Sequence, residues 1–456
     1  MARRGACLVV AALAAASLTA LRAPSAGAYP YADVTLEVHG YGGGEGMGQW
    51  GALGYALVGT TYSQILEHYY GTLSAGGTTH VGVPAGWSDG TVVSVALTEN
   101  GNGGNEDVIV RSDTAFTAGG VSVPANGAAR FHYDGTSWTV GTSQTVGANS
   151  CGGPWNTDVP VSGGPVAVPG APETFPGNVG GVALTLCYVG GNLTVRGNIE
   201  GTVNSSNQTR AVDLVALGPY VADVTPSESP ASWGTLGSAG PQGQNLGFQE
   251  LEAQAVAARS YVMNLHPGGY FGYADVCDTP ACQNYPGIAN ENSLTDLATT
   301  DTAGVAVLSP AGAPTLTQYS ASTGGYSAPG TFAAVVDAGD SVCVTGACNP
   351  YHAYAVQIPV SAIVAKFPQL GTLVSVGVPQ RNGLGDFGGR VLAMELEGSA
   401  QTVTLSGATF ASDFASYGLD GVALSNWFAL EGQPSGGIGG YWLAAADGGV
   451  FSFGDA

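Results

Sequence analysis

Hydrophobic and polar positions along the chain follow two different periods. Residues 61–70, TYSQILEHYY, place apolar side chains at helical spacing behind a capping-box pattern at Thr61 and Gln64, which predicts a short amphipathic helix. From about residue 80 to 215, alternating runs such as TVVSVALTE and EDVIVRS are separated by Gly, Asn, Asp and Pro, so this region is predicted to be rich in strands. Helical spacing returns in GFQELEAQAVAARSYVMNLHP, where Pro267 marks the expected end.

The last residues of the chain show a third pattern. After about residue 430, the linker EGQPSGGIGG leads to GYWLAAADGGVFSFGDA, in which two alternating runs flank an Asp-Gly-Gly turn. This pattern predicts one β-hairpin. A lone hairpin is marginally stable in water, so the segment is expected to be the first unit of a repeat array. It resembles the aromatic and glycine-rich repeats of exported actinobacterial proteins.

The composition supports a turn-rich globular protein. The chain has 456 residues, of which 73 are Gly and 25 are Pro, while 45% are hydrophobic. Glycine destabilises helix interiors, and this apolar fraction argues against disorder. The net charge of −22 arises because 33 acidic residues face only 11 Lys and Arg. Nucleic acid is therefore excluded as a partner class.

Residues 1–28 read as an export signal. Arg3 and Arg4 precede an apolar run that ends at the small-residue site Ala26-Gly27-Ala28. A retained membrane anchor is the alternative, but Ser17 and Thr19 interrupt the run, which is short for a membrane span. We therefore expect a secreted or cell-wall-associated protein.

Six cysteines remain once Cys7 is removed with the signal. An even number outside the cell indicates disulfides, and proximity in sequence favours three pairs. These pairs are Cys151–Cys187, Cys277–Cys282 and Cys343–Cys348. The alternative is a metal site built from Cys277, Cys282 and His266, but a zinc site usually needs four ligands and no second histidine lies nearby. We therefore expect no metal and no cofactor.

The glycine-rich stretch Gly40-YGGGEGMGQWG-Ala52 contains a G-x-G-x-x-G match from Gly46 to Gly51, and Glu67 lies at the distance of a ribose-binding acid. The βαβ unit of a dinucleotide site is missing, because the helix at 61–70 follows instead of a second strand. The glycines are therefore interpreted as a tight loop that needs positive φ angles.

Glu228, in VADVTPSESPASWG, is the acid with the clearest local constraint. It lies between Pro226 and Pro230 and is expected on a turn that leaves a strand-like run. The prolines restrict the backbone and would fix the direction of the carboxylate. A solvated loop acid is the alternative.

Four motifs in order resemble the family of stage II sporulation protein D (SpoIID) and LytB-type amidase enhancers. They are PSESPASWG, LEAQAVAARSY, CDTPACQNYPG and YSASTGGYS. The family pattern runs E-M-P, A-Q-A-V-A-A-R-[ST]-Y, Q-x-Y and S-G-G, and the second motif is unbroken at Ala253–Tyr261. The glycine-rich stretch is similar to the family signature G-x-G-H-G-x-G-M-[SG]-Q-[WY]-G-A. In two departures, Gly43 replaces the histidine and Ser229 replaces the methionine.

The resemblance implies peptidoglycan binding and lytic transglycosylase cleavage of glycan strands, with Glu228 as the single catalytic acid and base. Other positions that match the family motifs are candidates for shaping or lining the cleft: Gln49, Gln254, Arg259, Gln283, Tyr285, Ser322 and Thr323. For Gln254 and Arg259, a purely structural role in a small-residue helix is the alternative. For the hydroxyl cluster at Ser322 and Thr323, turn formation is the alternative to hydrogen bonding with sugar. The alternative function is a non-catalytic peptidoglycan-binding protein that stimulates a cell-wall amidase. A third hypothesis, a wall-anchored adhesion scaffold, rests on the terminal repeat.

The expected fold class is α+β, strand-rich with short helices. The domains are expected as 1–28 signal peptide, 29–79 glycine-rich signature segment and short helix, 80–209 strand-rich subdomain, 210–430 SpoIID/LytB-like core, and 431–456 linker and first unit of a β-repeat.

Export should remove residues 1–28, because the small-residue site ends at Ala28. N-terminal sequencing of protein recovered from the medium or wall should begin at Tyr29. A start at Met1 would show that the signal is not cleaved.

Overall fold

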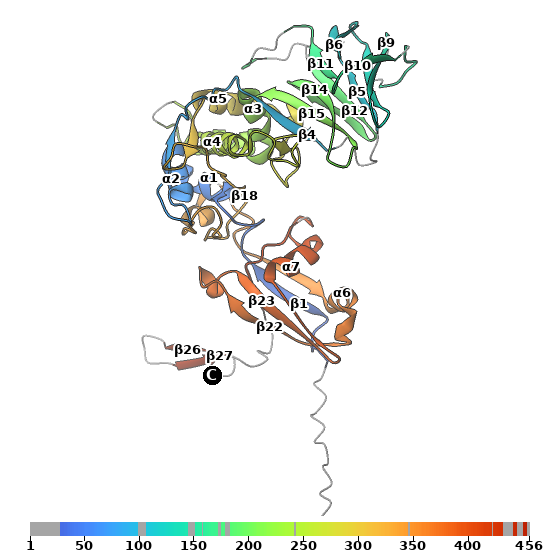
Figure 1. Cartoon of the computed structure of the whole chain (residues 1–456). Coiled ribbons are helices and arrows are strands. Elements are labelled where there is room, and N and C mark those ends of the chain that lie inside the picture. Colours follow the sequence, from blue (N-terminus) through green and yellow to red (C-terminus); the bar gives the residue numbers. More distant parts are fainter. Residues whose placement is uncertain are drawn as a thin grey trace, which may run out of the picture.

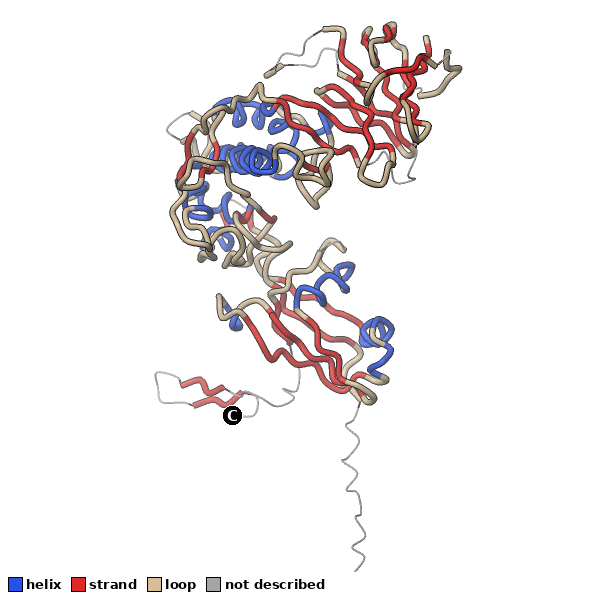
Figure 2. Tube along the Cα trace, viewed as in Figure 1, coloured by secondary structure: helices blue, strands red, loops and turns tan. Residues whose placement is uncertain are grey.

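The computed structural model describes residues 28–98, 106–144, 151–156, 158–171, 175–177, 183–240, 243–344, 347–421, 423–431, 441–444 and 450–453. Three lobes follow one another in space: a β-sandwich, a helical middle lobe and a C-terminal lobe built around small sheets (Figure 1, Figure 2). Helices and strands are both abundant and largely segregated, which confirms the α+β class. Residues 1–27 of the expected signal lie outside the described residues.

The β-sandwich consists of a seven-stranded sheet in the order β16-β4-β15-β14-β11-β6-β7 and a six-stranded sheet in the order β10-β9-β8-β5-β12-β13. Its strands are β4 (Val92–Leu97), β5 (Val108–Arg111), β6 (Phe116–Ala118), β7 (Val121–Val123), β8 (Ala128–Tyr133), β9 (Trp138–Ser143), β10 (Val159–Val161), β11 (Val166–Pro169), β12 (Leu184–Tyr188), β13 (Gly191–Val195), β14 (Asn198–Val203), β15 (Thr209–Ala216) and β16 (Val276–Cys277).

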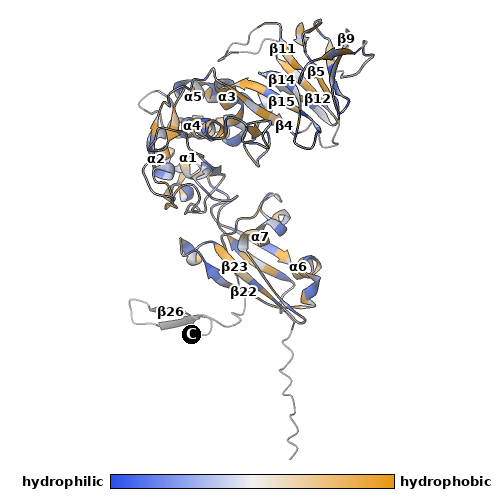
Figure 3. Ribbon diagram, in the orientation of Figure 1, coloured by the Kyte–Doolittle hydropathy of each residue, from blue (hydrophilic) through white to orange (hydrophobic). Residues whose placement is uncertain are grey.

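Alternating apolar side chains from both sheets meet in one core, which includes Val95, Val110, Phe131 and Ile199. Figure 3 shows these hydrophobic positions along the strands of the sandwich. The strand-rich prediction for this region is therefore confirmed.

The middle lobe packs its helices around α4 (Phe248–Leu265). The other helices are α1 (Gln49–Leu57), α2 (Tyr62–Tyr70), α3 (Leu217–Glu228), α5 (Ser293–Asp301) and the short 3₁₀ helices η1 (Ala231–Thr235), η2 (Gly287–Asn290) and η3 (Ala338–Ser341). Nearly every residue of α4 is buried, and its alanines allow neighbours to approach from all sides. Both predicted helices are confirmed. The capping box of α2 forms as expected, with the Thr61 and Gln64 side chains each paired to the other's backbone.

The prediction for the backbone around Glu228 was wrong. Residues 217–228 form helix α3, with Pro226 inside its last turn and Glu228 as its final residue, rather than a turn after a strand. Proline in a helix removes one N–H and crowds the carbonyl four residues earlier. Residues Tyr220, Val221 and Val224 are fully buried in the same core as the sandwich strands. This tertiary packing outweighs the local preference of proline.

The C-terminal lobe joins the first strand of the chain to the last residues. Its sheets have the orders β21-β1-β25 and β22-β23-β24. The elements are β1 (Asp33–Val38), β21 (Tyr354–Pro359), α6 (Val360–Lys366), η4 (Pro368–Leu370), β22 (Leu373–Arg381), η5 (Asp386–Gly388), β23 (Val391–Gly398), β24 (Thr402–Leu405), α7 (Gly407–Asp413), η6 (Ala415–Tyr417) and β25 (Phe428–Leu430). Because β1 is central in its sheet, the chain must leave this lobe at Val38 to reach the middle lobe.

The glycine-rich segment makes that crossing. Its strand β2 (Met47–Gly48) pairs in parallel with β18 (Tyr319–Ser320), and an isolated bridge joins Tyr41 to Ser322. Gly46 has a φ of 69°, and a Cβ there would lie 2.0 Å from the Gln318 carbonyl oxygen. Only glycine permits this approach, which agrees with the loop interpretation.

Three small two-stranded sheets complete the described structure. They are β3 (His80–Gly82) with β17 (Ala306–Leu308), β19 (Cys343–Val344) with β20 (Ala347–Cys348), and β26 (Tyr441–Ala444) with β27 (Val450–Phe453). The last of these confirms the predicted hairpin. Within the described ranges, no helix combines the length and apolar character needed to span a membrane.

The three cysteine pairs expected from the sequence are all bonded as disulfides. Cys277 and Cys282 are therefore unavailable to a metal, and His266 instead lies 2.9 Å from the Asp275 carboxylate.

Thiol titration of the denatured, unreduced mature protein should detect no free thiol, and reduction should release six. Denaturation ensures that burial does not hide a thiol from the reagent. Free cysteines accompanied by bound zinc would contradict the disulfide assignment.

Candidate functional site

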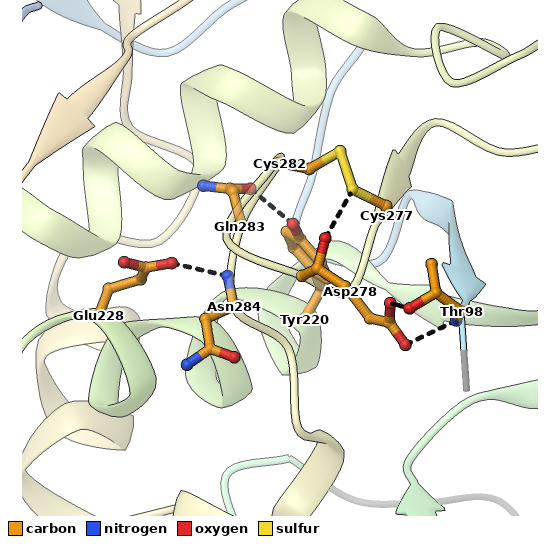
Figure 4. The surroundings of a disulfide bond; sticks show 9 residues. Thr98, Tyr220, Glu228, Cys277, Asp278, Cys282, Gln283 and Asn284 are labelled. Atoms are coloured by element: carbon orange, nitrogen blue, oxygen red, sulfur yellow. Dashed lines mark hydrogen bonds between the residues drawn. A yellow bond between two sulfur atoms is a disulfide. The ribbon is translucent and has the colours of Figure 1, made fainter. Parts of the chain in front are cut away.

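Glu228 ends α3 at a point where three other segments meet. Its Oε1 accepts a hydrogen bond of 2.6 Å from the backbone N–H of Asn284 (Figure 4). Its Oε2 lies 3.4 Å from Nε2 of Gln49, the first residue of α1. Burial raises the pKa of the Glu228 carboxyl above its usual value, and the bonds from Asn284, Gln49 and Tyr319 offset part of this rise. The group can therefore hold a proton at a higher pH than an exposed glutamate.

The loop that carries Asn284 is held by a disulfide and by Asp278. The Cys277–Cys282 bond closes the loop, and the Asp278 carboxylate accepts bonds from the Thr98 N–H and hydroxyl at 2.9 and 2.6 Å (Figure 4). Thr98 follows β4, so the loop is fixed to the edge of the sandwich. The position of the Asn284 N–H is thereby set before any ligand binds.

Gln283 connects two phenol groups beside the carboxyl. Its Oε1 accepts from the Tyr220 hydroxyl at 2.5 Å, and its Nε2 donates to the Tyr319 hydroxyl at 2.9 Å. Burial, followed by the charge of Glu228, raises the pKa of Tyr319 well above its usual value. Tyr319 is therefore a neutral donor beside Glu228.

Gln254 and Gln49 complete this side of the site. Gln254 is fully buried on α4, and its Oε1 lies 3.5 Å from Nε2 of Gln49. The structure thus brings together Glu228, Gln49, Gln254 and Gln283 from the sequence candidates, although their roles stay predictions.

Two further candidates, Arg259 and Tyr285, are held by partners other than the Glu228 carboxyl. Arg259 is fully buried, forms an ion pair with Asp89 at 3.1 Å and donates to the Thr299 and Val305 carbonyls. The Tyr285 hydroxyl donates to Asp213 at 2.7 Å. Neither residue hydrogen-bonds to Glu228, so nothing in these contacts assigns them a part in lining a cleft.

Ser322 and Thr323 are bound by buried aspartates. Ser322 donates to Asp340 at 2.8 Å, and Thr323 donates to Asp337 at 2.6 Å. Asp337 also accepts from the Tyr69 hydroxyl at 2.7 Å. These bonds hold the chain that follows Tyr319, so both hydroxyls act on the shape of the loop. The expectation that these two hydroxyls line a glycan-binding cleft stays a prediction.

Gly43 lies within the glycine-rich segment. It lines a hollow of about 470 Å³ together with Glu45, Asn426 and small residues of α7 and η6. A Cβ at Gly43 would meet no atom within 4 Å, so the position has room for a side chain. Glu228 is not among the residues that line this hollow.

Two contributors to the site were missed in the sequence. The Asn284 donor is a backbone N–H, which leaves no side-chain signal. Tyr319 stands at the start of the quoted YSASTGGYS motif and could have been chosen as an aromatic donor next to a hydroxyl cluster.

Fold and site together define an α+β protein in which one partly buried carboxyl group is surrounded by amide and phenol donors. Residues 205–309 match the family model of SpoIID, described as stage II sporulation protein. The match covers less than a quarter of the 456 residues and includes Glu228, α4 and the disulfide-closed loop. No curated protein and no solved structure matches the chain.

The buried Asp337 should make stability depend on pH. Burial and the neighbouring Asp340 raise its pKa from 3.8 to about 7, although bonds from Thr323 and Tyr69 oppose the rise. Because the folded state binds this proton more tightly, the stabilisation is complete below pH 4 and is lost as the pH rises to 7. The free energy of unfolding should therefore fall less between pH 4 and 7 in Asp337→Asn than in the unmodified protein, and the difference should be on the order of 2 to 4 kcal/mol.

Urea unfolding at several pH values measures this difference. Glu67→Gln, at an exposed position of α2, is a matched control that removes one acid and should keep the pH slope of the unmodified protein. An unchanged slope in Asp337→Asn would show that folding does not raise the pKa of Asp337.

Proposed function

We propose that this protein acts outside the cell on the glycan strands of peptidoglycan and cleaves them as a lytic transglycosylase. The observation that carries the proposal is the Glu228 carboxyl, whose pKa is raised by burial and whose hydrogen-bond partners are uncharged. The SpoIID match supports a cell-wall role, because it contains this residue. Three disulfides support export, since such bonds persist in oxidising surroundings.

The chemistry needs one group that first donates and then accepts a proton. Glu228 in its protonated form would give its proton to the glycosidic oxygen as the bond from that oxygen to C1 of the muramic residue breaks. The resulting carboxylate would take the proton from the C6 hydroxyl of the same muramic residue while O6 bonds to C1. The products are a free 4-hydroxyl end and a 1,6-anhydro end, and Glu228 returns to its starting form.

The cycle needs one carboxyl group, whereas ordinary glycosidases use two that lie about 5 to 10 Å apart. The Glu228 carboxyl accepts hydrogen bonds from the Asn284 N–H and the Gln49 amide. These neutral donors orient the carboxyl without the charge that would strongly favour its ionised form.

Glu228→Gln should lower the formation of anhydromuramic ends by at least about a hundredfold, because general acid–base catalysis typically contributes about 10² to 10⁴-fold. Mass spectrometry of denuded glycan strands incubated with each protein measures the product. Glycan binding and the melting temperature should stay near those of the unmodified protein, since glutamine preserves shape. Glu67→Gln on the surface is the matched control and should cleave normally.

Equal cleavage by Glu228→Gln would exclude Glu228 as the catalytic acid. If neither the unmodified protein nor the variant cleaves but both bind glycan, the non-catalytic amidase-enhancer function replaces the enzyme. Stimulation of a purified cell-wall amidase would then be the activity to measure.

A further inference from the structure

Ser229, next to Glu228, is a polar residue in a fully buried position. It stands where the family motif that this segment resembles has methionine. A buried hydroxyl is costly unless it is hydrogen-bonded. Ser229 meets this need by donating from Oγ to Oε1 of Glu250 at 2.6 Å, and its backbone N–H bonds to the Thr225 carbonyl at the end of α3. Both its backbone and its side chain are therefore fixed.

Glu250 is the more unusual partner, because glutamate is seldom fully buried without a cation. It lies in the first turn of α4 with no exposed surface. Burial raises the pKa of Glu250 to about 8, although the bond from Ser229 lowers it in part. The side chain is therefore mainly uncharged near neutral pH, and its bond to Ser229 joins two neutral groups.

The bond brings α3 and α4 together one helical turn from a second set of contacts to the candidate acid. Residues four apart share one face of a helix, so Glu250 and Gln254 lie one above the other on α4, although they do not hydrogen-bond to each other. Gln254 lies 3.5 Å from Gln49, which in turn lies 3.4 Å from Glu228. The end of α3 is therefore joined to α4 at Ser229 and Glu250, and the Glu228 side chain reaches the same helix through Gln49 and Gln254.

We propose that Ser229 and Glu250 are positioning residues that tie the end of α3 to the first turn of α4 and so hold the Glu228 carboxyl against the Asn284 N–H and Gln49. The catalytic meaning of this tie rests on the proposed function. The tie itself is a property of the free protein and is measurable without substrate.

Ser229→Ala removes the donor and leaves the Glu250 carboxyl without it. Loosening the end of α3 should admit water to Glu228, and because burial is the largest cause of its raised pKa, the titration midpoint should fall by at least about half a unit. NMR titration of ¹³C-glutamate-labelled full-length protein, with the Glu228 signal assigned from Glu228→Gln, measures this midpoint. The rate of anhydromuramic product formation at saturating glycan should fall about tenfold, with KM within twofold.

Two further variants keep the test independent of folding defects. Glu250→Gln, made in the presence of Ser229, retains an acceptor for the Ser229 hydroxyl and should keep both the Glu228 midpoint and the rate near those of the unmodified protein. Ser229→Ala combined with Glu250→Leu removes both polar partners, a replacement that can be nearly neutral for stability. The double variant should fold and still show the lower Glu228 midpoint.

Ser260→Ala is the matched control. Ser260 is also fully buried on α4 and hydrogen-bonded, to the Val256 carbonyl at 2.7 Å, but it does not hydrogen-bond to Ser229, Glu250, Gln254 or Gln49. It should leave the Glu228 midpoint unchanged. A Glu228 midpoint that is the same in the unmodified protein, Ser229→Ala and the double variant would overturn the proposal. Absence of cleavage by the unmodified protein would overturn only the proposed function, because the titration needs no substrate.

Discussion

The glycine-rich segment packs backbone against backbone on the loop at residues 318–325, and the site depends on this contact. A Cβ at Gly46 would lie 2.0 Å from the Gln318 carbonyl oxygen, and one at Gly40 would lie 2.9 Å from the Ser322 carbonyl oxygen. These approaches let Met47 pair with Tyr319 in the parallel β2–β18 ladder. The next residue after the ladder is Gln49, which reaches Glu228. The glycines at these positions thus permit a close approach that a side chain would block.

The charges of the middle lobe are arranged so that Glu228 meets no cation among the described residues. Arg259, the basic residue of the A-Q-A-V-A-A-R-S-Y motif, is paired with Asp89 instead. A cation beside Glu228 would favour its ionised form and lower the pKa that burial raises. Because Arg259 is paired elsewhere, it does not offset the rise in the Glu228 pKa that burial causes, and amide and phenol groups surround the carboxyl.

Local patterns in the sequence predicted the helices and disulfides that depend on nearby residues. Features that depend on long-range contacts were not predicted. The capping box of α2, the alanine pattern of α4 and the three disulfides could be predicted because their partners are close in sequence or share a helical period. The pairing of β1 with β21 joins residues more than 300 positions apart and leaves no local pattern. Helix α3 forms through Pro226 because packing against the sandwich core outweighs propensity. The side chains of the candidate site that lie together could be named from the sequence, whereas the backbone N–H of Asn284 could not, because it leaves no side-chain signal.

The family match and the site do not have the same boundaries. Residues 205–309 contain Glu228, Gln254 and Asn284, but Gln49 precedes the match and Tyr319 follows it. Both outer residues lie at the β2–β18 ladder, so one contact places both donors. Any change that separates the glycine-rich segment from the 318–325 loop would therefore remove Gln49 and loosen Tyr319 together. Water would then solvate the Glu228 carboxylate, and the group would return toward the acidity of an exposed glutamate.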